Sequence, residues 1–476
     1  MSLTKVTNSM ISGAPPSVFD WLTPALIAEV QSRSPTTNIT SQVQAAVNYA
    51  ITNNSGVLEF PSGVYLIDSL EITRQTAGTT AGLTLQGTPN DLVLNGTIIK
   101  ANSVQTNFIR IVGPTINIVI SDFTIDGQCK VTNSINFAPS GAETTSYNRI
   151  LNCLFFNVAN NGYHINARTA ASTYVEVAIV EVDNCGFTAN QQFAPFNQFA
   201  KAAINLENAG AWGWNITNTH FDGQNNECHL RFYAGGAKLD NCQFDNTSTI
   251  GTYDIHMYGS FQLNINSCNS GSAQTFLQVE PKVVTTIWDN FPINIISSQH
   301  YRPSGFDPTI YSIYYNQATN PLYITGFKTN SKGVGINGAG GANVPEKMVL
   351  TGTKYISAVT PTGDITQYIS QGTTSNSYPF VISDNTQYTT LNTYWVESSG
   401  QFITETNKVG TGSVPYVIGA NPLKLSEALL QLDARSFPPT NSPAASAQMF
   451  VRLSGGKYQL CCVFPTGAVQ VIATQP

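Results

Sequence analysis

The feature that most constrains the fold of this chain is a short pattern that returns seven times through its middle. In each copy an aliphatic residue is followed, two positions later, by Asp, Asn or Ser, at steps of 30, 32, 34, 23, 26 and 30 residues. The polar members are Asp122, Asn152, Asn184, Asn218, Asn241, Ser267 and Ser297. A repeat of this length indicates a solenoid. Because no helical stretch lies between the copies, we predict an all-β, right-handed parallel β-helix in which each copy is one coil.

The position after the polar residue is also repeated. It is occupied in the interior copies by Cys153, Cys185, Thr219, Cys242 and Cys268. We predict that these small side chains stack in one buried column, beside a ladder of Asn amides that bond to the coils above and below. A metal site is the alternative interpretation, but the chain lacks the Cys-x-x-Cys pairs and accompanying histidines that zinc requires. We therefore predict neither a metal nor another cofactor.

Charged residues are scarce, with 22 basic and 28 acidic residues among 476 and a net charge of −6. A chain without a basic stripe is a poor partner for nucleic acid, whereas an uncharged, hydrogen-bonding surface suits a glycan. No stretch approaches the roughly 18 apolar residues of a membrane span, and Met1–Lys5 precedes no apolar run of the kind found in export signals. The cysteines have no disulfide-framework spacing, which is typical of assembly in a cytosol.

A helix is predicted before the first coil. Thr40 or Ser41 can cap it, and Val43, Val47 and Ala50 recur at helical spacing before the chain turns at residues 53–56. Placed there, the helix would cover the open end of the β-helix, whose edge strands otherwise have no partners.

The run Gly56–Ile67 reads Gly-Val-x-x-Phe-Pro-x-Gly-x-Tyr-x-Ile. Preceded by a short helix, it resembles the first coil of pectate-lyase-like β-helices, particularly those of bacteriophage tailspikes. The lead-in segments Val6–Ala14 and Val18–Pro24 and the terminal run Phe464–Thr474 are similar to the neck and the end of phage tailspike depolymerases. This resemblance covers the first 67 residues and the last dozen, and the middle of the chain matches in style alone.

The resemblance implies a homotrimeric spike of the virion, assembled in the host cytoplasm and joined through its N-terminus to the phage tail or an adaptor protein. Such a spike binds and depolymerises a surface polysaccharide of the host bacterium, such as its capsule. Catalytic residues differ among members of the family, so the resemblance transfers no site to this chain.

A second strand in each coil supplies candidate site residues. Its inward apolar pair aligns from coil to coil, as in Ile204 with Leu206 and Leu230 with Phe232, and alternation sends the intervening side chains outward. The predicted outward residues are the sugar-binding candidates His164, Arg168, His229, Arg231, Tyr233, His256 and Tyr258, the carboxylates Glu207, Asp254 and Glu280, and the amides Asn166, Asn205 and Gln278. We interpret this face as a sugar-binding groove, with a trimer contact or a solvated sheet as the alternatives.

Glycoside hydrolysis uses one carboxylic acid to protonate the leaving oxygen and a second carboxylate to activate water or attack the sugar. Asp254 and Glu280 lie on successive coils, offset by two outward positions, so their backbones are expected roughly 8 Å apart. That separation falls within the range of about 6.5 to 9.5 Å that is typical of inverting enzymes. We predict Asp254 and Glu280 as the acid and the base, with Glu207 as the first substitute.

Three alternatives remain open at this stage. Asp222 and Asp245 form a rival carboxylate pair, although Asp222-Gly223 and Asp245-Asn246 are turn sequences whose side chains commonly bond their own backbone. A polysaccharide lyase would use His or Tyr as the base, with Arg168 or Arg231 neutralising a uronate carboxylate. A purely adhesive spike would cleave nothing.

The coil pattern fades after about residue 330, which suggests further β-domains. We predict four parts: a neck and lead-in over 1–35, the β-helix with its capping helix over 36–330, a second β-domain over 331–435 and a small C-terminal β-module over 436–476.

Overall fold

The computed structural model describes most of the chain from residue 14 to residue 329, and beyond it the strands given below, Gly455 and Gly456, and residues 468–476. Within the first stretch it leaves out residues 74–81, 90–94, 114, 139–144, 168–176, 189–198, 208–210, 223–225, 234, 246–252, 259–261, 272–274, 281–290, 302–310 and 316–321.

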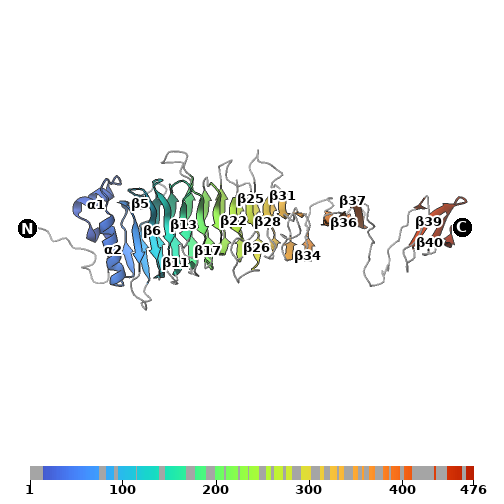
Figure 1. Ribbon diagram of the computed structural model, residues 1–476, viewed down its shortest axis with the longest axis horizontal. Coiled ribbons are helices and arrows are strands. Elements are labelled where there is room, and N and C mark those ends of the chain that lie inside the picture. The colour runs from blue at the N-terminus through green and yellow to red at the C-terminus, as the bar shows by residue number, and fades with distance from the viewer. Residues whose placement is uncertain are drawn as a thin grey trace, which may run out of the picture. The chain divides into compact units, whose positions relative to one another are not determined.

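Three long sheets of parallel strands run through the first unit of the chain. The strands of each sheet follow one another along the long axis of the β-helix in Figure 1. Sheet 1 contains, in spatial order, β1 (Val57–Glu59), β4 (Leu83–Gln86), β8 (Ile118–Ser121), β11 (Thr145–Leu151), β14 (Val177–Asp183), β17 (Trp214–Thr217), β20 (Ala237–Asp240), β23 (Leu263–Asn266), β26 (Ile293–Ile296), β29 (Leu322–Thr325), β32 (Lys347–Thr351) and β34 (Asp364–Ile369), with β7 (Thr115–Ile116) paired to β11.

Sheet 2 contains β2 (Gly63–Ile67), β5 (Thr97–Ala101), β9 (Phe123–Asp126), β12 (Leu154–Phe156), β15 (Gly186–Thr188), β18 (His220–Asp222), β21 (Gln243–Asp245), β24 (Asn269–Ser270), β27 (Gln299–His300) and β30 (Lys328–Thr329).

Sheet 3 contains β3 (Leu70–Thr73), β6 (Gln105–Val112), β10 (Val131–Phe137), β13 (Tyr163–Ala167), β16 (Ala202–Leu206), β19 (Cys228–Phe232), β22 (Tyr253–Tyr258), β25 (Thr275–Glu280), β28 (Tyr311–Tyr315), β31 (Lys332–Ile336) and β33 (Ile356–Ala358). The chain visits sheets 1, 2 and 3 in turn and then begins the next coil. This confirms the predicted parallel β-helix.

The repeated polar residues form the turn between sheets 1 and 2. All seven have a positive φ, between 48° and 67°, and Gly326 takes the same conformation one coil further on. This left-handed conformation is costly for most residues, but Asn and Asp adopt it more readily. Their amides form the expected ladder: Asn152 Nδ2 donates to Asp122 Oδ1 at 3.1 Å, and Asn184 Nδ2 donates to Asn152 Oδ1 at 2.8 Å.

The interior is filled by side chains that stack from coil to coil. The predicted column is buried, since Cys153, Cys185, Thr219, Cys242 and Cys268 are all at most 4% exposed. Beside it, the rings of Phe155, Phe187, Phe221 and Phe244 stack almost parallel, with centroids 4.8, 5.1 and 5.0 Å apart. These spacings match the distance between neighbouring strands, so each ring packs on its equivalent in the next coil.

Helices close the N-terminal end of the stack. The predicted helix is present as α2 (Thr40–Thr52), which buries Val43 and Val47 and contacts β1 and β3 (Figure 1). Its N-cap is Ile39 rather than Thr40 or Ser41, because the Thr40 hydroxyl accepts a hydrogen bond from the Asp68 N–H instead. Two further elements precede it and were not predicted: η2 (Val18–Trp21) and α1 (Pro24–Gln31).

The glycine that opens β2 explains one element of the first-coil motif. A Cβ on Gly63 would lie 2.6 Å from Cγ1 of Val30 in α1, closer than atoms can pack. Glycine at this position therefore lets α1 lie directly on the first coil.

The strand ladders continue past residue 330, the predicted end of the β-helix. Sheets 1 and 3 gain β31, β32, β33 and β34, all parallel, before a three-stranded antiparallel sheet forms from β35 (Pro379–Asp384), β36 (Gln387–Val396) and β37 (Gln401–Val409). The coil pairing therefore extends to Ile369, although the turn pattern that marks it in the sequence ends earlier.

A separate unit spans Ser413–Pro476. Its sheet has the order β38 (Ala434–Arg435), β39 (Gln448–Ser454), β40 (Lys457–Val463) and β41 (Val469–Thr474). The last three are antiparallel, with Gly455 and Gly456 at positive φ in the tight turn between β39 and β40. In the described part of the chain, neither α-helix is long and apolar enough to cross a membrane.

The turn ladder can be tested at Asn218, which donates to Asp183 and accepts from Asn241, each at 2.9 Å. We expect Asn218→Ala to lose both hydrogen bonds and to strain the left-handed backbone. Asn218→Gly loses the same bonds without the strain, so it should be more stable than Asn218→Ala by roughly 1 kcal/mol. Thermal unfolding of the two variants measures the difference.

Asn215 in β17 is the matched control, because its φ is not in the left-handed region. At position 215 the order of stability should reverse, so that Asn215→Gly is less stable than Asn215→Ala. Equal behaviour at the two positions would contradict the conformational role of the ladder.

Candidate functional site

One row of side chains runs along the outer face of sheet 3. Its register places one residue from each coil in line: Glu71, Arg110, Asn136, Asn166, Asn205, Arg231, His256, Gln278 and Tyr314. At about 4.8 Å per strand, the row is roughly 38 Å long. The residues on either side of it in each strand, such as Ile204 and Leu206, belong to the core, so the row faces away from the interior.

Amides in the middle of this row are hydrogen-bonded to one another. Asn166 Nδ2 donates to Asn136 Oδ1 at 3.2 Å, and Asn205 Nδ2 donates to Asn166 Oδ1 at 2.8 Å. Arg231 Nη1 continues the chain by donating to Asn205 Oδ1 at 2.9 Å. The ladder fixes these side chains before any ligand binds.

Arg231 is the centre of a charged cluster at the end of the amide ladder. Its Nε lies 3.1 Å from Glu227 Oε1, and its Nη1 lies 3.7 Å from Glu207 Oε2. The guanidinium also lies over the rings of Tyr233 and Tyr258, 5.0 and 5.5 Å from their centroids. The Arg231 side chain is only 9% exposed, whereas those of Glu207 and Glu227 are about one fifth exposed and remain accessible to a ligand.

Glu227 is held in its ionised form. Burial would raise its pKa, but the hydrogen bond from His256 and the charges of Arg231, His256 and Lys201 outweigh it and lower the pKa to about 2. The Glu227 Oε1 atom lies 2.9 Å from His256 Nδ1, and Oε2 lies 3.4 Å from Lys201 Nζ. Glu227 is therefore a carboxylate at neutral pH and cannot donate a proton there.

The two carboxylates on either side of Arg231 are close enough to act on one bond. Given their distances to Arg231 and the size of a planar guanidinium, their nearest oxygens are at most about 9 Å apart. This upper limit admits both the separation of about 6.5 to 9.5 Å found in inverting glycosidases and the roughly 5 to 5.5 Å found in retaining ones. Glu207 was among the predicted carboxylates, and the structure brings it together with Arg231, Tyr233, His256 and Tyr258.

Three of the residues predicted to face outward point into the core instead. His164, His229 and Asp254 are 3%, 1% and 0% exposed. His164 packs against Phe155 and Phe187, and His229 packs against Phe221 and Phe244. The prediction for their orientation is wrong because the second and third residues of these strands, such as Asp254 and Ile255, both face inward.

The strand pairing shows where the alternation is interrupted. Pairing passes from Cys228 with Tyr253 directly to Leu230 with Ile255, and both Asp254 and Ile255 are fully buried. The regular alternation holds only after this point, which is why Arg231 and His256 face outward as predicted.

Burial disfavours the charged forms of these inward side chains. Burial lowers the pKa of His164 and of His229 to about 3. It also raises the pKa of Asp254 well above its usual range, although the nearby Ser270 side chain acts in the opposite direction. His229 Nε2 and Asp254 Oδ1 are 3.8 Å apart, too far for a hydrogen bond.

The predicted pair of Asp254 and Glu280 is therefore not on one face. Glu280 ends β25 on the outer side, where its Oε1 accepts a hydrogen bond from Gln278 Nε2 at 2.5 Å, and it lies beside Tyr258. Arg168 lies outside the described residues.

Glu227 was not identified from the sequence. It precedes β19 by one residue, so it was not counted in the strand, yet it lies four positions before Arg231, within reach of that side chain. A carboxylate at this spacing from an outward Arg, just ahead of a strand, is the signal that could have identified it.

The rival pair Asp222 and Asp245 lies elsewhere, at the ends of β18 and β21 in sheet 2. His220 Nε2 lies 2.9 Å from Asp245 Oδ2, and Gln243 Nε2 donates to the same oxygen at 2.6 Å. Among the residues that the structure describes, no group of three or more His, Cys, Asp or Glu side chains is placed to hold a metal ion.

No protein-family model matches the sequence, and no curated protein matches it. The solved structures to which the chain is similar include the tailspike protein gp49 of the Acinetobacter baumannii bacteriophage Fri1, a capsular polysaccharide depolymerase, with 10% identity over 91% of this chain and 81% of that chain and a TM-score of 0.34.

Two further similar structures are tailspike protein 3 of bacteriophage CBA120 and the A-module of the mannuronan C-5 epimerase AlgE4 of Azotobacter vinelandii. The first has 11% identity over 82% of this chain and 68% of that chain, with a TM-score of 0.29. The second has 12% identity over 74% of this chain and 100% of that chain, with a TM-score of 0.35. At these identities no residue's role is carried over to this chain.

The burial of Asp254 gives a pH-dependent prediction. Its pKa is raised on folding, so the folded state is penalised at every pH at which the unfolded carboxyl is ionised, that is above about pH 4. We expect Asp254→Asn to raise the thermal unfolding midpoint by a few degrees at pH 8, and the gain to vanish near pH 3. Unfolding scans of both proteins at the two pH values provide the test. A lower midpoint for the variant at pH 8 would show that the ionised form is the stable one.

Proposed function

We propose that this protein is a phage tailspike that binds a surface polysaccharide of its host bacterium and cleaves it by glycosidic hydrolysis. The observation that carries the proposal is the placement of Glu207 and Glu227 on either side of Arg231, at the end of the ladder of hydrogen-bonded Asn amides. The carboxylates of Glu207 and Glu227 are about one fifth exposed and can accept hydrogen bonds from sugar hydroxyls, whereas the amides of Asn136, Asn166 and Asn205 are buried and hold the Arg231 cluster in place. The first-coil motif and its resemblance to tailspikes support the same function.

The two carboxylates divide the chemistry between them. Glu227 stays ionised, so it takes the proton of the attacking water, whose oxygen bonds to the anomeric carbon. Glu207 is the general acid, which donates a proton to the glycosidic oxygen as that bond breaks. The tyrosine rings beside Arg231 supply flat surfaces on which sugar rings can stack. Attack and departure on opposite faces of the ring invert the anomeric configuration.

We expect Glu207→Gln and Glu227→Gln each to lower turnover at least about a hundredfold, the usual scale for a lost general acid or base. The assay is the release of reducing ends from purified polysaccharides, followed by mass spectrometry of the products. Glu280→Gln is the matched control, because Glu280 is an outward carboxylate on the same sheet that accepts a hydrogen bond from Gln278 and lies beside Tyr258.

Each contrary outcome of this assay has a distinct meaning. Full activity in both Glu207→Gln and Glu227→Gln would contradict the assignment of these two residues. A loss of activity in Glu280→Gln alone would place the catalytic site near Glu280 instead. Products with unsaturated, ultraviolet-absorbing ends would identify a lyase, in which Arg231 neutralises a uronate. No release from any polysaccharide, with binding retained, would identify an adhesin.

The assembly is part of the same proposal. A phage spike is expected to be a homotrimer that attaches through its N-terminal segment to the tail or to an adaptor protein. Light scattering should then give a mass near three times 51.3 kDa. A monomer at micromolar concentration would count against the tailspike assignment.

A further inference from the structure

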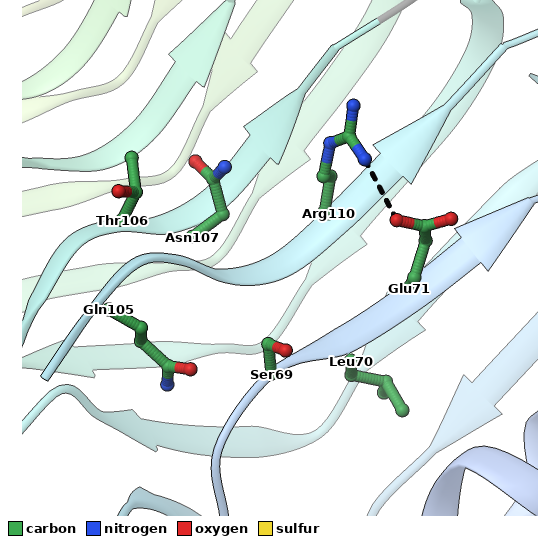
Figure 2. A pocket seen from close by; sticks show the side chains of 7 residues that line it. All are labelled: Ser69, Leu70, Glu71, Gln105, Thr106, Asn107 and Arg110. Carbon is green, nitrogen blue, oxygen red and sulfur yellow. Dashed lines mark hydrogen bonds and ion pairs between the residues drawn. The ribbon is translucent and has the colours of Figure 1, made fainter. Parts of the chain in front are cut away.

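A polar groove lies at the N-terminal end of the sheet 3 row. Figure 2 shows it between β3 and β6, in the first coils. It has a volume of about 300 Å³ and is lined by Ser69, Leu70, Glu71, Gln105, Thr106, Asn107 and Arg110. All of these except Leu70 carry hydrogen-bonding side chains, and none of them belongs to the Arg231 cluster.

The groove is held in place by its neighbours. The backbone of Glu71 is tied to α2 through Gln44, whose Oε1 accepts from the Glu71 N–H at 2.9 Å and whose Nε2 donates to the Glu71 carbonyl at 2.8 Å. Gln105 donates to the Asp68 carbonyl, and Asn107 Oδ1 accepts from Asn133 Nδ2 at 2.8 Å. The groove is therefore anchored to the capping helix on one side and to the next coil on the other.

The ion pair in the groove, between Arg110 and Glu71, is exposed to solvent. Arg110 Nη1 lies 2.8 Å from Glu71 Oε2, as the dashed line in Figure 2 shows, and the two side chains are 41% and 50% exposed. A guanidinium has five N–H donors, so a single carboxylate oxygen leaves most of them for solvent or a ligand. A pair so exposed contributes little to stability, which leaves its presence in a charge-poor chain without a structural reason.

The groove and the Arg231 cluster are aligned. Arg110 and Arg231 occupy the same row, four coils and roughly 19 Å apart, and Asn136, Asn166 and Asn205 lie between them. A chain that lies along this row from the cleavage centre reaches the groove without crossing another sheet.

We propose that the Glu71–Arg110 groove is a second binding site for the same polysaccharide, and that it takes an uncharged sugar unit several residues away from the bond that is cleaved. Adjacent donor and acceptor groups match vicinal hydroxyls, each of which both donates and accepts. An acidic sugar would instead meet the Glu71 carboxylate beside Arg110. The inference rests on the proposed function, because it assumes that the Arg231 cluster engages the same chain.

The test compares affinities for long and short fragments of one polysaccharide that the wild-type protein cleaves, measured by calorimetry in the uncleaving Glu207→Gln protein. Fragments long enough to span both sites should bind more tightly than short ones. Adding Arg110→Ala should reduce the affinity for long fragments about tenfold, the scale of one or two lost hydrogen bonds to a charged group. The matched control is Arg149→Ala, which breaks an exposed pair with Glu181 on neighbouring coils of sheet 1 and should change nothing.

Several results would overturn the inference. The first is that Arg149→Ala lowers the affinity for long fragments as much as Arg110→Ala does, and the second is that Arg110→Ala does not lower it. The third is an affinity for long fragments that falls steeply with added salt, which would indicate an acidic sugar. A change in the mass of Arg110→Ala by light scattering would make the groove a contact between copies of the chain. If the wild-type protein cleaves no polysaccharide, the proposed function fails on that result, and the length dependence for any glycan that binds still decides the second site.

Discussion

The structure depends on equivalent residues lying directly above one another in successive coils. The left-handed turn residues between sheets 1 and 2 set this register, since each coil makes the same change of direction at the same point. Their side-chain amides then bond from coil to coil, and the phenylalanine rings behind them stack about one strand spacing apart. A slip by one residue would place the polar ladder in the core and expose the rings, so packing and hydrogen bonding enforce the same alignment.

The candidate site is a consequence of this register. Because every strand of sheet 3 presents the same position outward, residues more than two hundred positions apart in the sequence, such as Glu71 and Gln278, fall into one row. Most of the row is neutral and already hydrogen-bonded. Charge is concentrated where Lys201, Glu207, Glu227, Arg231 and His256 meet, and there the surrounding cations keep Glu227 ionised. Ordered polar groups that do not rearrange on binding are well suited to hold an extended chain.

Much of this could be predicted from the sequence, because the repeat carries physical information. The position that needs a left-handed backbone selects Asn, Asp or Ser, and the next position selects a small buried residue, so the register of the coils that carry these residues was readable from the sequence. Outward orientation was correct for Arg231 and His256, where simple alternation holds. The predicted outward orientation was wrong for His164, His229 and Asp254. Two consecutive inward residues near the start of a strand interrupt the alternation, and a period-two sequence pattern does not reveal this. Glu227 was missed because it lies just outside the strand. The region of β31 to β34 was assigned to a second β-domain rather than to the coils, because the turn residues that mark the coils do not recur there.

The most direct test of the central claim is a crystal structure of the Glu207→Gln protein with a bound fragment of a polysaccharide that the wild-type protein cleaves. The account predicts sugar density along the outer face of sheet 3, with one glycosidic oxygen beside residue 207 and the chain running over the Asn205, Asn166 and Asn136 amides toward Arg110. Density over sheet 1 or sheet 2, or beside Asp222 and Asp245, would contradict it.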